Sequence, residues 1–277
     1  MDEIGSNISL GEFLRARRQR LAPEEVGLSS YCRRRTPGLR REEVAQLAHI
    51  GTSWYTSLEQ NRDVNPSEEV LDNLAAALRL TVDERRYLHM LAKPKELGKE
   101  KSQEVNVGIE RMVGSLEPNP AVVLGRGWDL LIWNKAAELV FQLPVFSKGL
   151  QRRPNWMRRF LTDSSLRVNN NDWGAKAQAM IAQFRADYAH FPNDIRFKEL
   201  IEEFMCISEL FRETWPRHDV QIVADCHKQW NDPRIGEMEF EHVTLQQPND
   251  PELKIMIYTA STDTAARLQG LLGIRGE

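Results

Sequence analysis

The residues best suited to chemistry near the start of the chain are arginines. Between Leu10 and Arg41 the sequence has nine arginines and three acidic residues, whereas the whole chain has a formal net charge of −3. A guanidinium group presents a rigid fork of N–H donors that matches phosphate oxygens. This local positive charge fits a surface that faces nucleic acid, and a solvated arginine face of a helix explains the charge alone about as well. The nine arginines are Arg15, Arg17, Arg18, Arg20, Arg33, Arg34, Arg35, Arg40 and Arg41.

Catalytic and metal-binding motifs are missing from the sequence. It contains no phosphate-binding glycine loop, no nucleophile elbow and no His-Glu-x-x-His pair. The six histidines have no ligand spacing, and Cys32, Cys206 and Cys226 form no Cys-x-x-Cys pair, which argues against a zinc site and a disulfide framework. We therefore expect a protein that is not an enzyme, with no catalytic residue, no metal and no cofactor.

Length and composition indicate a globular protein of more than one domain. The 277 residues exceed an ordinary single domain, and 41% hydrophobic with 28% charged residues are typical of globular chains. The start is acidic and unlike a signal peptide, and no window of about 18 apolar residues could span a membrane. We expect a cytoplasmic protein with no membrane contact.

The first ninety residues predict five short helices. Ser9 with Glu12, and Thr81 with Glu84, have the spacing of capping boxes at helix starts. Further helices are expected at about 40–47 and 52–60, and a fourth begins with Asn65 as its cap. In the first helix the leucines and the phenylalanine fall on one face, which we expect to be buried, with the arginines on the other face.

Residues 42–61 contain two short helical segments joined by a tight turn. Ala45 is small where the helices would cross, Ile50 fills the turn, and Leu58 closes the core. This spacing is that of a helix-turn-helix, in which the second helix projects side chains into the major groove of DNA. An ordinary helical hairpin without a ligand is the alternative, and the flanking arginines favour DNA binding.

The segment resembles the phage-repressor or XRE class of helix-turn-helix domains, and more narrowly the MmyB-like regulators. The resemblance rests on residues 34–45 (RRTPGLRREEVA), 54–55 (WY), 58–60 (LEQ) and 65–67 (NPS). It departs from the class at His49 in the turn, at Gly51 in place of a Ser or Thr cap, and at Asn61 after the second helix. Asn61 is compatible with left-handed backbone.

The resemblance implies a set of DNA-binding residues. The recognition helix begins at Gly51 or Thr52, and its short hydroxyls face the groove, where they can accept or donate hydrogen bonds and so leave the operator sequence undefined. Arginines before and after it are candidates for phosphate contacts. The expected DNA-binding residues are Arg33, Arg34, Arg35, Arg40, Arg41, Thr52, Ser53, Trp54, Thr56, Ser57 and Arg62, with Arg15 behind them.

Beyond a charged hinge at 93–106, the sequence predicts a domain with both helices and strands. Strands are expected at 121–124, 128–132, 220–225, 237–245 and 254–259, with helices at about 109–116, 134–141, 155–162, 172–188, 196–206, 208–215 and 263–272. This order indicates an α+β domain in which helices cover one side of an antiparallel sheet. The fold class is thus multi-domain: an all-α five-helix domain at 1–92, followed by an α+β domain at 107–277.

The second part of the chain resembles the MmyB-type ligand-binding domain. The matching segments are 120–124 (PAVVL), 128–137 (WDLLIWNKAA), 211–220 (FRETWPRHDV) and 257–260 (IYTA). The resemblance implies a PAS-like fold and a small effector that is apolar or like a fatty acid. Residues at 230–233 (WNDP) depart from the family, which commonly has His-Pro there, and 146–151 is an insertion.

A sensor pocket needs an apolar lining and a few polar groups. Arg159 and His218 could meet a carboxylate, and Asn134 could orient it, although Asn134 also fits a helix cap and each candidate is more often a core or structural residue. The full set is Trp128, Leu130, Trp133, Asn134, Arg159, Phe160, Trp173, Phe184, Phe211, Trp215 and His218.

The sequence as a whole predicts a DNA-binding transcriptional regulator. Its partners are expected to be a double-stranded DNA operator, a small-molecule effector and a second copy of the chain, because one helix-turn-helix domain covers only a half-site. The alternative is a DNA-binding protein whose C-terminal domain serves only dimerisation or the recruitment of a partner protein.

Overall fold

A computed structural model of the chain describes residues 9–28, 38–62, 64–93, 105–146, 153–168, 172–191, 194–220, 227–247 and 250–273. The chain forms two compact units. The helical unit comprises Met1–Leu97 and Ala179–Val223, and the sheet unit comprises Gly98–Gln178 and Ala224–Glu277. Each unit is described separately below.

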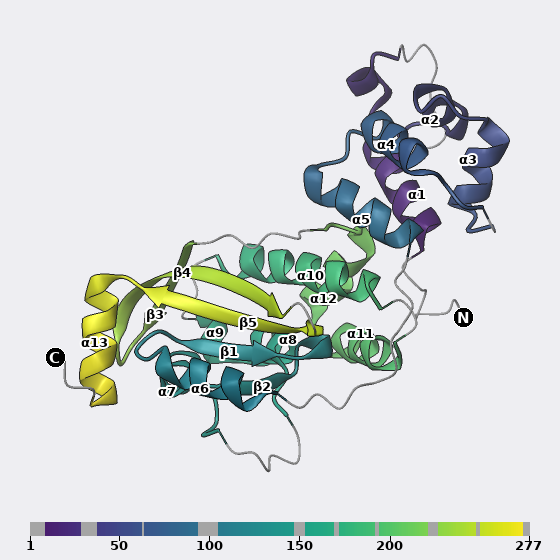
Figure 1. The fold of residues 1–277 in the computed structure, drawn as a ribbon. Helices are drawn as coiled ribbons and strands as arrows, with labels where there is room; N and C mark the ends of the chain where they lie inside the picture. Colours follow the sequence, from purple (N-terminus) through teal and green to yellow (C-terminus); the bar gives the residue numbers. More distant parts are fainter. Residues whose placement is uncertain are drawn as a thin grey trace. The chain divides into compact units, whose positions relative to one another are not determined.

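Most described residues of the helical unit lie in helices (Figure 1). Its first part has the five expected α-helices and one short 3₁₀ helix, and its second part has the end of α10 followed by α11, α12 and a 3₁₀ turn. The elements are α1 (Leu10–Arg20), η1 (Pro23–Val26), α2 (Arg41–Leu47), α3 (Thr52–Glu59), α4 (Glu68–Ala77), α5 (Val82–Ala92), α10 (Trp173–Ala189), α11 (Ile195–Ile207), α12 (Glu209–Thr214) and η3 (Trp215–Arg217).

Local capping residues set the starts of α1, α4 and α5. The capping boxes of Ser9 and Thr81 are confirmed, since each side chain accepts a hydrogen bond from the N–H three residues later and each glutamate returns one. The cap of α4 differs from the expectation. Ser67, not Asn65, is the N-cap, and its Oγ accepts from Val70 N at 3.3 Å, so α4 begins after the serine.

The expected exposure of the arginines in α1 is only partly correct. Phe13 and Leu14 are fully buried as predicted, but Arg17 is 1% exposed and Arg18 is 8% exposed. The sequence pattern placed both on the solvent side because arginine is rarely buried unless it is paired. Acidic side chains from α3 and α5 supply the partners that make this burial tolerable.

The sheet unit is an antiparallel sheet with helices, as the α+β fold class predicts (Figure 1). The strand order is β2-β1-β5-β4-β3, and all pairs are antiparallel. The elements are α6 (Val107–Ser115), β1 (Ala121–Leu124), η2 (Arg126–Trp128), β2 (Leu130–Trp133), α7 (Lys135–Phe141), α8 (Trp156–Thr162), α9 (Ser164–Val168), β3 (His227–Asp232), β4 (Gly236–Gln247), β5 (Asp250–Ala260) and α13 (Thr262–Leu272).

Helices cover both faces of the sheet, which corrects the expectation of one covered face. On one face, Val113 of α6 packs with Val123 and Ile255 in a buried apolar cluster. Residues at alternate positions point to the other face. There, the ring of Phe141 of α7 lies 4.9 Å from that of Tyr258.

The structure contradicts one strand boundary, leaves one predicted strand mostly outside the described residues, and contains two elements that were not predicted. Trp128 lies in the 3₁₀ turn η2 with a φ of 68°, so β2 begins later, at Leu130. The strand expected at 220–225 lies mostly outside the described residues, and its first residue, Val220, is not in a strand. The sequence reasoning did not identify β3 or the short helix α9.

The start of α1 lies close against the end of α3. A Cβ atom at Gly11 would lie 2.4 Å from the carbonyl oxygen of Glu59, so only glycine fits here without a shift of backbone. Gly11 N also donates to Oδ1 of Asn61 at 2.8 Å. The contact fixes the end of α3 against α1.

We predict that Gly11→Ala lowers the free energy of unfolding by about 2 kcal/mol, because the added methyl group overpacks a backbone contact. Gly114→Ala in α6 is the matched control, since its Cβ would meet nothing within 4 Å. The control is expected to be neutral or to stabilise by up to about 1 kcal/mol, because alanine is the better helix former. Urea unfolding of both variants measures this, and equal stability of the two would contradict the packing argument.

Candidate functional site

The turn between α2 and α3 has the geometry of a helix-turn-helix. His49 adopts the left-handed conformation, with a φ of 56°, and Ile50 N donates to Ala45 O at 2.9 Å. Gly51 is the residue before α3 and caps it without a side chain. The departures noted at His49 and Gly51 are therefore accommodated in the turn.

Helix α3 is anchored on one side and open on the other. Tyr55 and Leu58 are buried to 0% and 1% exposure, whereas Thr52 and Ser53 at its first turn are exposed. Trp54, Thr56 and Ser57 are half-buried. Thus the residues predicted to face DNA lie on the accessible side of this helix.

The hydroxyl groups in the second turn of α3 are already used as donors. Thr56 Oγ1 donates to Thr52 O at 2.8 Å, and Ser57 Oγ donates to Ser53 O at 3.1 Å. Such bonds to the preceding turn use the hydroxyl hydrogen and leave the oxygen lone pairs as acceptors. These two residues are consequently suited to accept hydrogen bonds from bases or from ordered water.

A buried carboxylate holds the end of α3 in place. Glu59, with a side chain 1% exposed, accepts from Arg18 Nη2 at 2.6 Å and Arg18 Nε at 3.1 Å. Arg41 Nε donates to the same carboxylate at 3.2 Å. Burial acts to raise the pKa of Glu59, but the hydrogen bonds from Arg18 and Arg41 outweigh it and hold the pKa below its ordinary value. The cluster joins α1, α2 and α3 through one charged group.

The structure places the predicted phosphate-binding arginines in different situations. Arg41 is committed to Glu59, although its side chain stays 43% exposed. Arg15, Arg40 and Arg62 are exposed, and Arg40 lies 3.6 Å from Glu42 in an exposed ion pair. Arg33, Arg34 and Arg35 lie outside the described residues.

Asn61 ends α3 through its backbone conformation and also holds α3 against α1 through its side chain. Its φ is 52°, as expected for a residue that replaces glycine. Its side chain also donates to Ser9 Oγ at 2.7 Å and accepts from Gly11 N, so it ties the end of α3 to the cap of α1. The sequence reasoning missed this role, because residues 50 positions apart give no local signal.

The residues predicted to line a sensor pocket fall into separate groups in the sheet unit. Trp128, Leu130 and Trp133 are buried in η2 and β2, and Trp133 Nε1 donates to Pro144 O at 3.0 Å. Phe160 stacks on Trp173, with ring centroids 6.1 Å apart and an interplanar angle of 13°. Each group is held by contacts within the protein.

The polar residues of the sheet unit that were predicted to bind the ligand form hydrogen bonds with backbone groups of the protein. Asn134 accepts from the N–H groups of Ala121 and Ala137 and donates to the carbonyls of Val113 and Asn119, which fills its hydrogen-bonding capacity. Its expected role as a helix cap is confirmed.

Arg159 binds the carbonyl groups at the end of α7. Its Nη2 donates to Phe141 O at 3.0 Å and to Gln142 O at 3.1 Å, and it pairs with Asp163 at 3.2 Å. The Nε of Arg159 is buried without a partner.

An aromatic cluster that was not predicted lies at the centre of the sheet unit. The ring of Phe141 contacts those of Trp156, Trp230 and Tyr258, with centroids 4.9–5.2 Å apart. Tyr258 in turn stacks on His242 at 4.7 Å. Burial lowers the pKa of His242 to about 4, with a further contribution from the positive charge of Lys228, so the imidazole is neutral at pH 7. The alternation of apolar and polar residues along β4 and β5 is the sequence signal that could have identified this face of the sheet.

The remaining predicted ligand residues lie in the helical unit. Phe211 stacks on Trp215 with centroids 5.0 Å apart, and Phe184 lies 6.3 Å from the same indole. Burial, together with the positive charges of Arg185 and Arg17, lowers the pKa of His218 to about 4. The structure therefore brings together Phe184, Phe211, Trp215 and His218, and it assigns them to a different unit from the other candidates.

Comparison with known protein families gives one match for the N-terminal helices and one for the C-terminal part of the chain. Residues 105–271 match the MmyB-like transcription regulator ligand binding domain, and residues 9–88 match a helix-turn-helix domain. The chain belongs to the MmyB-like family. It is a DNA-binding transcription regulator with a ligand-binding domain in its C-terminal part. No curated protein matches the chain.

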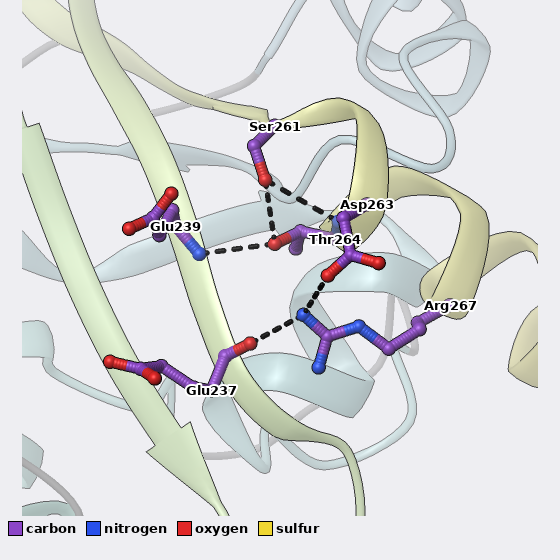
Figure 2. Close-up of a pocket in the computed structure, with 6 residues that line it drawn as sticks. All are labelled: Glu237, Glu239, Ser261, Asp263, Thr264 and Arg267. Atoms are coloured by element: carbon purple, nitrogen blue, oxygen red, sulfur yellow. Dashed lines mark hydrogen bonds and ion pairs between the residues drawn. The ribbon is translucent and has the colours of Figure 1, made fainter.

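A polar pocket of about 450 Å³ lies in this ligand-binding domain, between the start of β4 and the start of α13 (Figure 2). Arg267 crosses it, donating to the carbonyl oxygens of Ile235 and Glu237 and to Asp263. Glu237, Glu239, Ser261, Asp263, Thr264 and Arg267 line it. None of the predicted ligand residues is among them, and a charged lining does not suit an apolar effector.

No described helix is long and apolar enough to cross a membrane. Within the same residues, no group of three or more His, Cys, Asp or Glu side chains could hold a metal ion.

We predict that Glu59→Gln lowers the free energy of unfolding at pH 7 by roughly 3 kcal/mol, because the neutral amide leaves the buried charge of Arg18 without its counterion. Urea unfolding measures the loss, and Glu42→Gln, at an exposed position, is the control. Because the folded-state pKa of Glu59 lies below 4.5, its charge stabilises the fold above that pH. The difference between wild type and variant should shrink as the pH falls through the folded-state pKa. A pH-independent difference would contradict the role of the charge.

Proposed function

We propose that this regulator binds duplex DNA sequence-specifically, with the first turns of α3 in the major groove. The observation that carries the proposal is the two-sided character of α3: Tyr55, Leu58 and Glu59 are buried on one side, and Thr52 and Ser53 are exposed at its start. In helix-turn-helix proteins the N-terminal residues of the second helix contact the base edges. The short hydroxyl side chains of Thr52, Ser53, Thr56 and Ser57 are the base-reading groups of this proposal, and Trp54 lies against the sugar-phosphate backbone.

Phosphate contacts come from arginines on both sides of α3. Arg40 precedes α2 and Arg62 follows α3, and both side chains are exposed. The triplet Arg33, Arg34 and Arg35 belongs to the same proposal on sequence grounds alone. Arg41 contributes less, because its guanidinium is bound to Glu59.

We predict that Arg40→Ala and Arg62→Ala each weaken binding to any duplex, whatever its sequence, and reduce the slope of log Kobs against log salt by about 1. Each substitution removes one phosphate contact. Fluorescence anisotropy with specific and random duplexes at several salt concentrations measures the slope. Arg86→Ala, at an exposed position in α5, is the matched control. An unchanged slope would remove that arginine from the interface.

The effector of the ligand-binding domain is proposed to be a small apolar molecule, like a fatty acid. The support is the family match over residues 105–271 together with the density of buried aromatic side chains in the same range. Apolar pockets with few polar groups bind such molecules. The effector acts by changing the population of chains whose DNA-binding helices can reach the operator.

The regulator is proposed to act as a homodimer. A single helix-turn-helix domain covers one half-site, and two copies related by symmetry bind two half-sites about one helical turn apart.

We predict that native mass spectrometry of the purified full chain shows a dimer that carries an apolar molecule, which organic extraction then releases. Adding the extracted molecule back should change operator affinity by about fivefold or more. Full DNA affinity with no bound molecule, and none taken up, would instead favour a C-terminal domain that serves dimerisation or recruits a partner protein. An operator affinity that does not respond to saturating ligand would contradict the coupling.

A further inference from the structure

Buried polar atoms without partners gather at one place in the helical unit. Over the described residues, eight buried side-chain nitrogen or oxygen atoms have no hydrogen-bond partner. Five of them belong to residues of α1, α5, α10, α12 and the end of η3. They are Arg17 Nε, Tyr87 OH, Arg185 Nη1, Thr214 Oγ1 and His218 Nδ1. The charges of Arg17 and Arg185 act on both Tyr87 and His218, and Thr214 directly precedes Trp215, whose carbonyl Arg185 binds.

The backbone around η3 brings these side chains together. Arg17 donates through Nη2 to the carbonyl of His218, and Arg185 donates through Nη2 to the carbonyl of Trp215 and through Nε to Asp219 O at 3.2 Å. The guanidinium of Arg185 also lies over the indole of Trp215, at 4.0 Å from the ring centroid. The last carbonyls of α12 and η3 are thereby occupied by two arginines.

Negative charge in the group does not balance its positive charge. Arg17 and Arg185 are each 1% exposed. Glu84, the buried carboxylate near Arg17 at 3.2 Å, is shared with Arg20 at 2.9 Å, and Asp219 is 52% exposed. Burial, with the neighbouring charge of Arg17, lowers the pKa of Arg185 to about 10 although Tyr87 and Asp219 act to raise it, which is the response expected of a buried cation short of counterions.

The group therefore has more unpaired hydrogen-bond donors than acceptors, and none of its unpartnered atoms carries negative charge. Arginine nitrogens only donate, and the hydroxyls of Tyr87 and Thr214 have no acceptor within the protein. A group of oxygen atoms with a negative charge would accept these hydrogen bonds and neutralise the cations, and arginine binds such groups in a bidentate manner. A water molecule could accept hydrogen bonds from these donors, but it would not neutralise the positive charge of the two arginines.

We propose that Arg17, Tyr87, Arg185, Thr214 and His218 form a binding site for an oxyanion. The site joins α1 of the DNA-binding region to α10 and η3 of the segment matched by the ligand-binding family. An oxyanion bound there stabilises the contact of α1 with η3. It is either a free inorganic or small organic anion or the acid group of an amphiphilic molecule, for which the aromatic rings of Phe184, Phe211 and Trp215 supply an apolar wall.

The test titrates the purified full chain with sodium phosphate, sodium acetate or sodium dodecanoate below its micelle concentration. Sodium chloride keeps the ionic strength constant, because screening alone changes stability. Isothermal titration calorimetry gives the affinity, and the thermal unfolding midpoint gives the stabilisation, which rises with ligand concentration. No DNA is present, so the result does not depend on operator binding. Dodecanoate could also bind as the proposed apolar effector, and the Tyr87→Phe variant separates that binding from binding at this site.

Tyr87→Phe is the decisive variant, because it removes one unpartnered hydroxyl and keeps the ring. The proposal expects one saturable site whose Kd rises roughly tenfold in Tyr87→Phe. In chloride alone the variant should unfold at the same temperature as wild type or higher, because the buried hydroxyl has no partner to lose. Tyr55→Phe removes a buried hydroxyl from α3 and is the matched control, with an unchanged Kd.

The outcomes separate the sources of the anion. Saturable binding of phosphate or acetate that Tyr87→Phe weakens supports a free anion, and the same result with dodecanoate alone supports the acid group of an amphiphile. Absence of saturable binding by all three, or a Kd that Tyr87→Phe leaves unchanged, overturns the site. A lower unfolding temperature of Tyr87→Phe in chloride also overturns it, because the hydroxyl would then have a partner in the protein.

Discussion

Two adjacent buried arginines of α1 impose the main constraint on the helical unit. Arg17 and Arg18 follow one another in the sequence. A buried guanidinium without an acceptor would cost the folded state roughly 3–5 kcal/mol, so each of them needs a partner inside the protein. Arg18 finds Glu59 at the end of α3 and the carbonyl of Leu39. Arg17 finds Glu84 in α5 and the carbonyl of His218. One helix thus fixes the ends of several others.

This arrangement explains how α3 can hold its small side chains in defined positions, as the proposed contact with a DNA groove requires. A recognition helix of 8 residues has little stability of its own. Its position is set from outside, by Glu59 in the buried ion cluster, by Asn61 bonded to Ser9, and by the close approach of Gly11. The exposed face therefore needs no apolar residue for anchoring and can carry hydroxyl groups.

The ligand-binding region shares residues with both compact units. The family match covers 105–271, whereas Ala179–Val223 is compact with the helices that carry the DNA-binding motif. The ends of α12 and η3, held by Arg17 and Arg185, lie within this shared segment. A signal that altered this segment would act directly on a helix that positions α3, and this physical link supports the coupling that we propose.

Sequence alone determined what depends on neighbours along the chain. The boxes of Ser9 and Thr81, the helix cap of Asn134 and the alternating strands β4 and β5 follow from spacings of two to four residues, and the family resemblance supplied the fold class. Only the tertiary structure decided which charges are buried. Arg17 and Arg18 lie in the same arginine-rich stretch as the exposed Arg15, and they are buried because Glu84 and Glu59, 67 and 41 positions away, are folded against them. Partners so distant leave no periodic signal, so the sites that depend on them emerge only when the chain is folded.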